Sequence, residues 1–270
     1  MRLSDCADRW LRVVAGAFGE NAGFRGVLAR RGRGLVMVLA GSLAMAGCGV
    51  LPPLPDPVPS NVVPSLATLA APEGADQLNA NDIQTLDRMA IRIRNVGCQA
   101  LSTGSGFAID KRMIITNKHV VAGAKSLQLL TYDGRDVTAE TAATADLADI
   151  ALVRTAQDLD FAPSLATSDP ASGDPVTVIG YPDGGKLTVT TGAVIGATTD
   201  PLNENLGQVL VTDAPVEPGS SGSAALNEAG EVIGVVYAKT TTGKSLLVPV
   251  STLRTMLADD SAFSPVPPCN

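Results

Sequence analysis

The feature that most constrains the fold is a succession of short apolar runs, rich in Val and Ile, between residues 91 and 250. Gly, Pro, Asp and Asn separate these runs at fairly regular intervals. Branched residues favour strands, and turn residues at this spacing end one strand before the next begins. The pattern therefore predicts an all-β sandwich or barrel. The expected strands are 105–109, 113–116, 127–132, 150–153, 176–180, 187–195, 208–212, 232–238 and 245–250.

Two short helices are expected at the borders of this β region. Residues 79–90 place Ile83, Leu86 and Met89 at helical spacing, with Asn81 able to cap the first turn. Ser251 precedes the segment Thr-Leu-Arg-Thr-Met-Leu, which predicts a short C-terminal helix with a serine cap. We see no internal repeat, so residues 79–270 are expected to form one domain.

The first 48 residues have the layout of an export signal. Four arginines between residues 25 and 33 precede an apolar run from Leu35 to Ala46, which ends at Gly47-Cys48. A positive segment, a short apolar segment and then small residues are typical of a secretory leader. The run is shorter than the roughly 20 apolar residues that a membrane span needs. We therefore predict that residues 1–48 are a leader and that the protein is exported to the cell envelope.

The end of this leader resembles a bacterial lipobox, in which the cysteine becomes the lipidated first residue of the mature protein. Met45 stands where leucine is usual. We predict lipidation of Cys48 and a membrane anchor facing the extracytoplasmic side. An ordinary signal peptide, or an uncleaved anchor with an incidental Cys48, is the alternative.

Residues 49–78 are expected to be a spacer between the anchor and the folded domain. Six prolines lie between positions 52 and 64. Proline favours the extended polyproline conformation, so such a segment is semi-rigid. We expect no catalytic residues in this segment.

The charge of the chain excludes some partners. Residues 1–48 carry seven Arg and three acidic residues, which leaves 13 basic and 24 acidic residues, a net charge of −11, in the remainder. Binding to nucleic acid needs a basic surface, so no nucleic-acid partner is expected.

Two cysteines, Cys98 and Cys269, lie outside the leader and the proposed lipidation site. An even pair in an oxidising compartment suggests a disulfide. Two free thiols or a metal pair are the alternatives. No histidine or third cysteine stands nearby in the sequence, so we expect neither a metal site nor a cofactor.

Three polar residues could form a catalytic triad. The single histidine, His119, precedes Asp149 at the head of an apolar run and Ser221 in a loop rich in Gly and Ser. Taken alone, each has an ordinary explanation as a structural histidine, a turn carboxylate or a hairpin loop. In this order they fit a nucleophilic serine, a base that takes its proton and a carboxylate that fixes the base's tautomer. Flanking glycines would let the main-chain N–H groups of Gly219 and Ser221 face a developing oxyanion.

The local sequences around these residues resemble those of trypsin-like serine peptidases, above all of the bacterial HtrA/Deg branch. The resemblance implies two six-stranded antiparallel β-barrels of the chymotrypsin type with the triad in the cleft between them. The likeness covers roughly residues 98–257. The segments that carry it are Gly104-Ser105-Gly106-Phe107, Ile115-Thr116-Asn117-Lys118-His119-Val120-Val121, Asp149-Ile150-Ala151-Leu152, Val178-Ile179-Gly180-Tyr181-Pro182, Thr188-Val189-Thr190-Thr191-Gly192, Thr212-Asp213-Ala214-Pro215, Pro218-Gly219-Ser220-Ser221-Gly222-Ser223 and Glu231-Val232-Ile233-Gly234-Val235.

The chain departs from that family at several positions. Ser220 replaces the usual Asn or Asp before the nucleophile, and Ser223-Ala224 replaces the usual Gly-Pro after it. Asp146 and Ser220 compete for the roles of acid and nucleophile, but the motifs favour Asp149 and Ser221. No PDZ-type domain is expected after the protease domain.

The resemblance also places a substrate pocket. Pro215, six residues before the nucleophile, would lie at its base, and Tyr237 and Ala238 would form a wall. Because Pro215 is not acidic, we expect a small or medium apolar side chain before the scissile bond, not Lys or Arg.

The predicted function is hydrolysis of peptide bonds in protein or peptide substrates through an acyl-enzyme intermediate on Ser221. The alternative is a latent or non-catalytic binding module that keeps the protease fold, because a fold does not determine function.

Overall fold

The computed structural model describes residues 78, 80–202, 204–205, 207–267 and 269. The expected leader, Cys48 and the spacer up to residue 77 lie outside the described residues. In the described part of the chain, no helix is long and apolar enough to cross a membrane.

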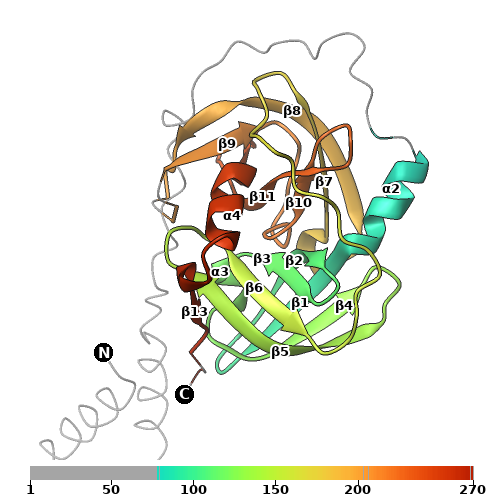
Figure 1. Cartoon of the computed structure of the whole chain (residues 1–270), viewed down its shortest axis with the longest axis vertical. Helices are drawn as coiled ribbons and strands as arrows, with labels where there is room; N and C mark the ends of the chain where they lie inside the picture. The colour runs from blue at the N-terminus through green and yellow to red at the C-terminus, as the bar shows by residue number, and fades with distance from the viewer. Residues whose placement is uncertain (1–77, 79, 203, 206, 268, 270) are drawn as a thin grey trace, which may run out of the picture. The chain divides into compact units, whose positions relative to one another are not determined.

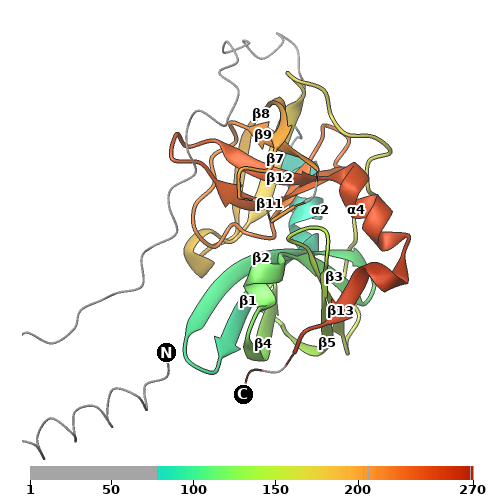
Figure 2. The same cartoon turned by 90° about the vertical axis from the view of Figure 1, so that its left-hand side faces the viewer.

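Six antiparallel strands form the first barrel, in the order β5-β4-β1-β2-β3-β6, and pairing of β5 with β6 closes it. A further short strand, β13 (Phe263–Pro265), pairs with β5 from outside the barrel. Figures 1 and 2 show this barrel as the lower half of the molecule, with β13 reaching it from the C-terminal segment. Its strands are β1 (Ala90–Gly97), β2 (Leu101–Asp110), β3 (Met113–Thr116), β4 (Ala124–Thr131), β5 (Asp136–Ala145) and β6 (Ala151–Thr155).

The second barrel is also closed and six-stranded, in the order β10-β11-β12-β9-β8-β7. Neighbouring strands in it are again antiparallel, and β7 and β10 complete the ring. The predicted fold of two six-stranded antiparallel barrels is therefore confirmed. The strands are β7 (Pro175–Gly180), β8 (Thr188–Thr199), β9 (Gln208–Thr212), β10 (Ala224–Leu226), β11 (Val232–Lys239) and β12 (Ser245–Pro249).

Helices are few and short. They are α2 (Ala80–Leu86), α3 (Lys118–Val121), α4 (Val250–Leu257) and the 3-10 turns η1 (Asp87–Met89), η2 (Pro182–Gly184) and η3 (Asp260–Ala262). The expected C-terminal helix is confirmed as α4, but the expected serine cap is wrong. Pro249 occupies the N-cap position, and Ser251 lies inside the first turn. There its hydroxyl and its N–H both donate to Asp169, at 2.6 and 2.9 Å.

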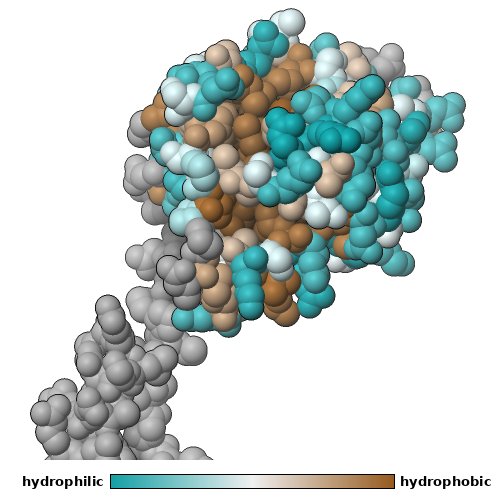
Figure 3. All heavy atoms as spheres, turned by 60° about the horizontal axis from the view of Figure 1, so that its bottom comes forward, coloured by the Kyte–Doolittle hydropathy of each residue, from teal (hydrophilic) through white to brown (hydrophobic). Residues whose placement is uncertain are grey.

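A continuous apolar core joins the two barrels. One cluster of buried side chains contains Phe107 and Ile115 from the first barrel and Val235 and Leu246 from the second. Burial of this shared surface holds the barrels together, at roughly 25 cal/mol for each Å² of apolar area removed from water. Outside the core, an apolar band crosses the face drawn in Figure 3 between two hydrophilic areas.

The predicted disulfide is present. Cys98, just after β1, is bonded to Cys269, and their Cα atoms lie 6.0 Å apart. The bond joins the first barrel to residues that follow β13. It closes a loop with a sequence separation of 171 residues.

Candidate active site

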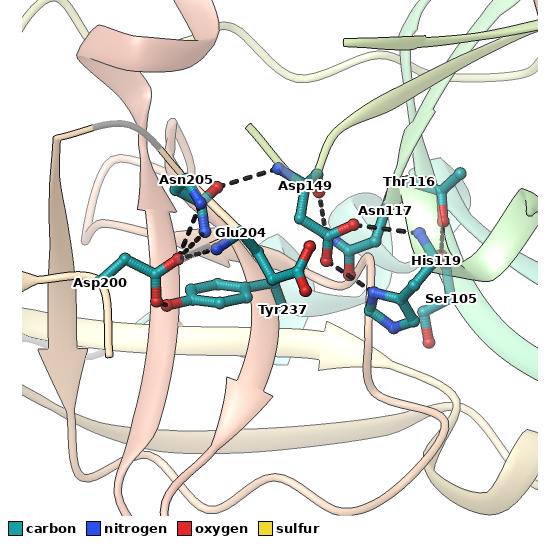
Figure 4. Close-up of polar contacts among 9 residues, drawn as sticks. All are labelled: Ser105, Thr116, Asn117, His119, Asp149, Asp200, Glu204, Asn205 and Tyr237. Atoms are coloured by element: carbon teal, nitrogen blue, oxygen red, sulfur yellow. Dashed lines mark hydrogen bonds and ion pairs between the residues drawn. The ribbon is translucent and has the colours of Figure 1, made fainter. Parts of the chain in front are cut away.

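The histidine lies on a single helical turn that the preceding strand places at the edge of the first barrel. Thr116, the last residue of β3, donates its hydroxyl to the Ser105 carbonyl on β2 at 2.6 Å. Asn117 is fully buried, and its side-chain amide donates to the main-chain carbonyl of Asp149 at 2.7 Å. These two anchors fix the entry to α3, so that His119 faces Asp149 (Figure 4).

The buried carboxylate of Asp149 makes two contacts with this histidine. Its Oδ1 accepts the main-chain N–H of His119 at 3.0 Å, and its Oδ2 lies 2.6 Å from the ring Nδ1. An ionised carboxylate can only accept, so the ring faces it with a proton on Nδ1, and in the neutral imidazole Nε2 is then the nitrogen that can accept a proton. Asp149 is 3% exposed, whereas 51% of the His119 side chain is accessible. The competing carboxylate, Asp146, is exposed and makes no described contact with the ring.

The loop that carries Ser221 is held by β2 and β11. The Ser105 N–H donates to the Ser221 carbonyl at 2.7 Å, and the Ser105 hydroxyl donates to the Gly219 carbonyl at 2.8 Å. On the other side, the Gly222 N–H donates to the Val236 carbonyl at 2.8 Å. Because Thr116 also bonds to Ser105, the strand that leads to the histidine and the loop of the serine meet at one residue.

This loop also presents main-chain donors. The Pro218 carbonyl accepts the N–H of Asp183 at 2.5 Å, and the described peptide bonds are trans. Carbonyl and N–H point in opposite directions across a trans peptide, so the Gly219 N–H points away from Asp183. Within the described residues, neither the Gly219 N–H nor the Ser221 N–H has a hydrogen-bond partner. Two free donors on one loop suit the stabilisation of a developing oxyanion.

Ser221 is half-buried, and within the described part of the chain it makes no hydrogen bond to His119. Catalytic hydrogen bonds are often long before substrate binds and tighten in the complex. The missing bond is therefore compatible with a Ser221–His119 pair.

A hollow of about 210 Å³ lies beside Ser221. Its wall is mostly apolar, and an ion pair of 2.9 Å joins Glu217 and Lys239 in the lining. The lining residues are Val216, Glu217, Pro218, Ser220, Ser221, Val236, Ala238 and Lys239.

Of the three residues expected in the pocket, the structure places only Ala238 in the lining of this hollow. Pro215 is exposed, and its carbonyl accepts the hydroxyl of Thr190 at 2.8 Å. Tyr237 is 4% exposed and packs in the core shared by the barrels. Val236 and Ala238 both line the hollow, and the register of β11 shifts between them at Tyr237.

Sequence reasoning did not find a second set of hydrogen-bonded residues that lies behind Asp149. The Asp149 N–H donates to the side-chain oxygen of Asn205 at 3.0 Å. Asn205 is bonded in turn to the buried carboxylate of Asp200, which accepts the Tyr237 hydroxyl (Figure 4). Burial and the bond to Asp200 raise the pKa of Tyr237 above its ordinary range. Nothing local in the sequence marks Asp200 or Asn205, since both stand in a polar hairpin.

Residues 104–235 match the family model described as a trypsin-like peptidase domain. The chain therefore carries a trypsin-like peptidase domain. The peptidase domain contains all three candidate triad residues. Within the described residues, no group of three His, Cys, Asp or Glu side chains could hold a metal ion.

Curated relatives of this peptidase domain carry HtrA-type names. The chain is 37% identical over 139 residues to a probable periplasmic serine endoprotease, DegP-like, of Hahella chejuensis, covering 51% of this chain and 30% of the relative. It is 38% identical over 149 residues to the serine protease Do-like HtrA of Bacillus subtilis, covering 49% of this chain and 32% of that relative. The chain thus spans about a third of the length of these relatives.

Solved structures give the same fold. The Rv3671c protease of Mycobacterium tuberculosis, in its active form, superposes with a TM-score of 0.66 at 24% identity, covering 77% of this chain and 96% of that one. A serine endoprotease from Yersinia pestis superposes with a TM-score of 0.58 at 27% identity, covering 68% of this chain and 66% of that one.

Proposed function

We propose that the protein is an exported serine endopeptidase whose triad is His119, Asp149 and Ser221. The observation that carries the proposal is the buried Asp149 carboxylate 2.6 Å from the His119 Nδ1, beside a loop with two unbonded main-chain donors. The match of residues 104–235 to a trypsin-like peptidase domain supports the same chemistry.

The reaction follows from the roles of these groups. The Ser221 Oγ attacks the scissile carbonyl while the His119 Nε2 takes its proton, and Asp149 stabilises the imidazolium. The Gly219 and Ser221 N–H groups bind the oxyanion. In a well-studied case, one such donor stabilises the transition state by about 3–4 kcal/mol. The imidazolium then protonates the leaving amine, and water attacks the acyl-enzyme to release the second product.

The hollow beside Ser221 supports a preference for a small or medium apolar side chain before the scissile bond. Val216, Val236 and Ala238 supply apolar surface, and the carboxylate of Glu217 is paired with Lys239. A substrate lysine or arginine would thus find no unpaired acid among the residues that line the hollow.

The place of action is the extracytoplasmic side of the envelope, with Cys48 lipidated and the proline-rich segment as a spacer. The leader layout and the word periplasmic in a relative's name support this. Mass spectrometry of the mature N-terminus tests it, since an unmodified Cys48, or cleavage at another site, contradicts the lipid anchor. The substrates are peptides or proteins.

Labelling with a fluorophosphonate tests the catalytic proposal. The purified, oxidised protein should be labelled, and Ser221→Ala and His119→Ala should both abolish the label while keeping the fold. Labelling that persists in Ser221→Ala would refute the choice of nucleophile. A folded protein that is never labelled would favour the latent or non-catalytic alternative.

A further inference from the structure

A buried carboxylate in the connection between β8 and β9 organises the segment behind the catalytic acid. Asp200 is 3% exposed and accepts the main-chain N–H groups of Leu202, Glu204 and Asn205 at 2.8–3.0 Å. The Asn205 side-chain amide donates to it at 2.8 Å and the Tyr237 hydroxyl at 2.5 Å. Five donors therefore surround one carboxylate, and Figure 4 shows Glu204, Asn205 and Tyr237 gathered around it.

The Asn205 amide joins this carboxylate to the catalytic acid. Its Nδ2 donates to Asp200, and its Oδ1 accepts the Asp149 N–H at 3.0 Å. A carboxylate only accepts and a main-chain N–H only donates, so the two contacts allow one orientation of the amide. Asp200 therefore determines which end of Asn205 faces the acid.

The main chain of Asp149 is held by side chains on both sides. Asn117 donates to its carbonyl at 2.7 Å, and Asn205 accepts from its N–H. Asp149 precedes β6, so its N–H is not part of a strand ladder. The carboxylate that faces His119 thus depends for its position on two asparagine amides.

The residues behind Asn205 come from the second barrel. Tyr237 lies on β11, and on the same strand the Val236 carbonyl accepts the Gly222 N–H from the nucleophile loop at 2.8 Å. One strand thus supports the serine loop directly and the acid through Asp200 and Asn205.

We infer that Tyr237, Asp200 and Asn205 form a positioning relay that sets the catalytic acid against the nucleophile across the two barrels. None of the three lines the hollow beside Ser221. The inference rests on the proposed function, because it assigns the relay a role in the same triad. A loss of one hydrogen bond in the relay lets Asp149 shift, and a displacement of about 1 Å at a reacting group can cost about 100-fold in rate.

The chain's single histidine allows a direct test by NMR, because every imidazole signal belongs to His119. In a Ser221→Ala background, the parent should show one low-field Nδ1–H resonance and a strong preference for the Nδ1–H tautomer. Tyr237→Phe should broaden that resonance and raise the share of the Nε2–H tautomer. Tyr181→Phe is the matched control, since Tyr181 is another buried tyrosine, whose hydroxyl lies 3.5 Å from the Ala90 carbonyl, outside the relay.

Kinetics with the active protein give the second readout. Tyr237→Phe should lower kcat about 10-fold, and Asn205→Ala about 100-fold, with KM changed less than about twofold. Should Asn205→Ala fail to fold, Tyr237→Phe decides alone. A folded Tyr237→Phe variant with the parent's His119 resonance and the parent's kcat overturns the relay. If the parent is not labelled by fluorophosphonate, the proposed function fails, but the NMR comparison still tests the relay.

Discussion

Replacing Gly222 by alanine tests whether contact with β2 holds the nucleophile loop in place. Gly222 has a φ of +87°, and a Cβ built on it would lie 2.1 Å from the Ser105 carbonyl oxygen and 2.5 Å from the Thr116 hydroxyl. Such a Cβ is more than 1 Å closer than an ordinary contact. The left-handed conformation costs about 1–2 kcal/mol, and overpacking adds about 1–3 kcal/mol. The variant should therefore lose about 2–5 kcal/mol of unfolding free energy.

The loop must also move away from Ser105, which stretches the bond that positions Ser221. We expect fluorophosphonate labelling of the folded variant to slow by about 100-fold or more. Gly134→Ala is the matched control, because Gly134 has a φ of +83° but nothing within 4 Å of an added Cβ. It should lose only about 1–2 kcal/mol in urea denaturation and keep the parent's labelling rate. Equal stability losses in the two variants, or a Gly222→Ala variant labelled at the parent rate, would refute the reasoning.

Three further predictions concern the disulfide, an alkaline transition and the acid. Replacing Cys98 and Cys269 together by serine should lower the unfolding free energy by up to about 5 kcal/mol in the chain-entropy model, measured by urea denaturation; a change below 1 kcal/mol would contradict it. Burial raises the pKa of Tyr181 from the ordinary tyrosine value of about 10 to about 12, so the unfolded state releases this proton first and stability falls as pH rises above about 10, by about 1.4 kcal/mol per pH unit. Tyr181→Phe should flatten that decline in urea midpoints taken between pH 9 and 11.5, and an unchanged slope would argue against it. Asp149→Asn should lower kcat by about 10⁴ with the fold intact, whereas Asp146→Asn should have little effect; the reverse order would reassign the acid.

Much of the fold could be predicted because strand pattern and turn residues recur locally. The runs at 113–116, 176–180 and 208–212 became β3, β7 and β9 almost residue for residue. β5 was missed because its sequence, DVTAETAATA, holds few large apolar residues and much of it is exposed. β10 was missed because it has only three residues, too few to show any period.

Part of the candidate site could also be predicted from local sequence, and part could not. His119, Asp149 and Ser221 stand in motifs whose neighbouring residues build their own support, so local sequence is informative. The relay depends on contacts across 37 residues, from Tyr237 to Asp200, and across 56 residues, from Asn205 to Asp149. Sequence alone does not pair residues so far apart, and the family resemblance places Tyr237 in the wall of the substrate pocket instead.

β13 and Cys269 are synthesised after all the barrel strands, so the disulfide can form only in a chain that has been completed. β5 ends at Ala145 and β13 begins at Phe263, so the whole second barrel is synthesised between them. A chain that stops just after α4 contains all twelve barrel strands but lacks the covalent partner of Cys98. Such a product would carry a reactive thiol at the end of β1. With the leader removed and Cys48 lipidated, as proposed above, a thiol-specific reagent would therefore distinguish prematurely terminated molecules from finished ones, even where both have folded barrels.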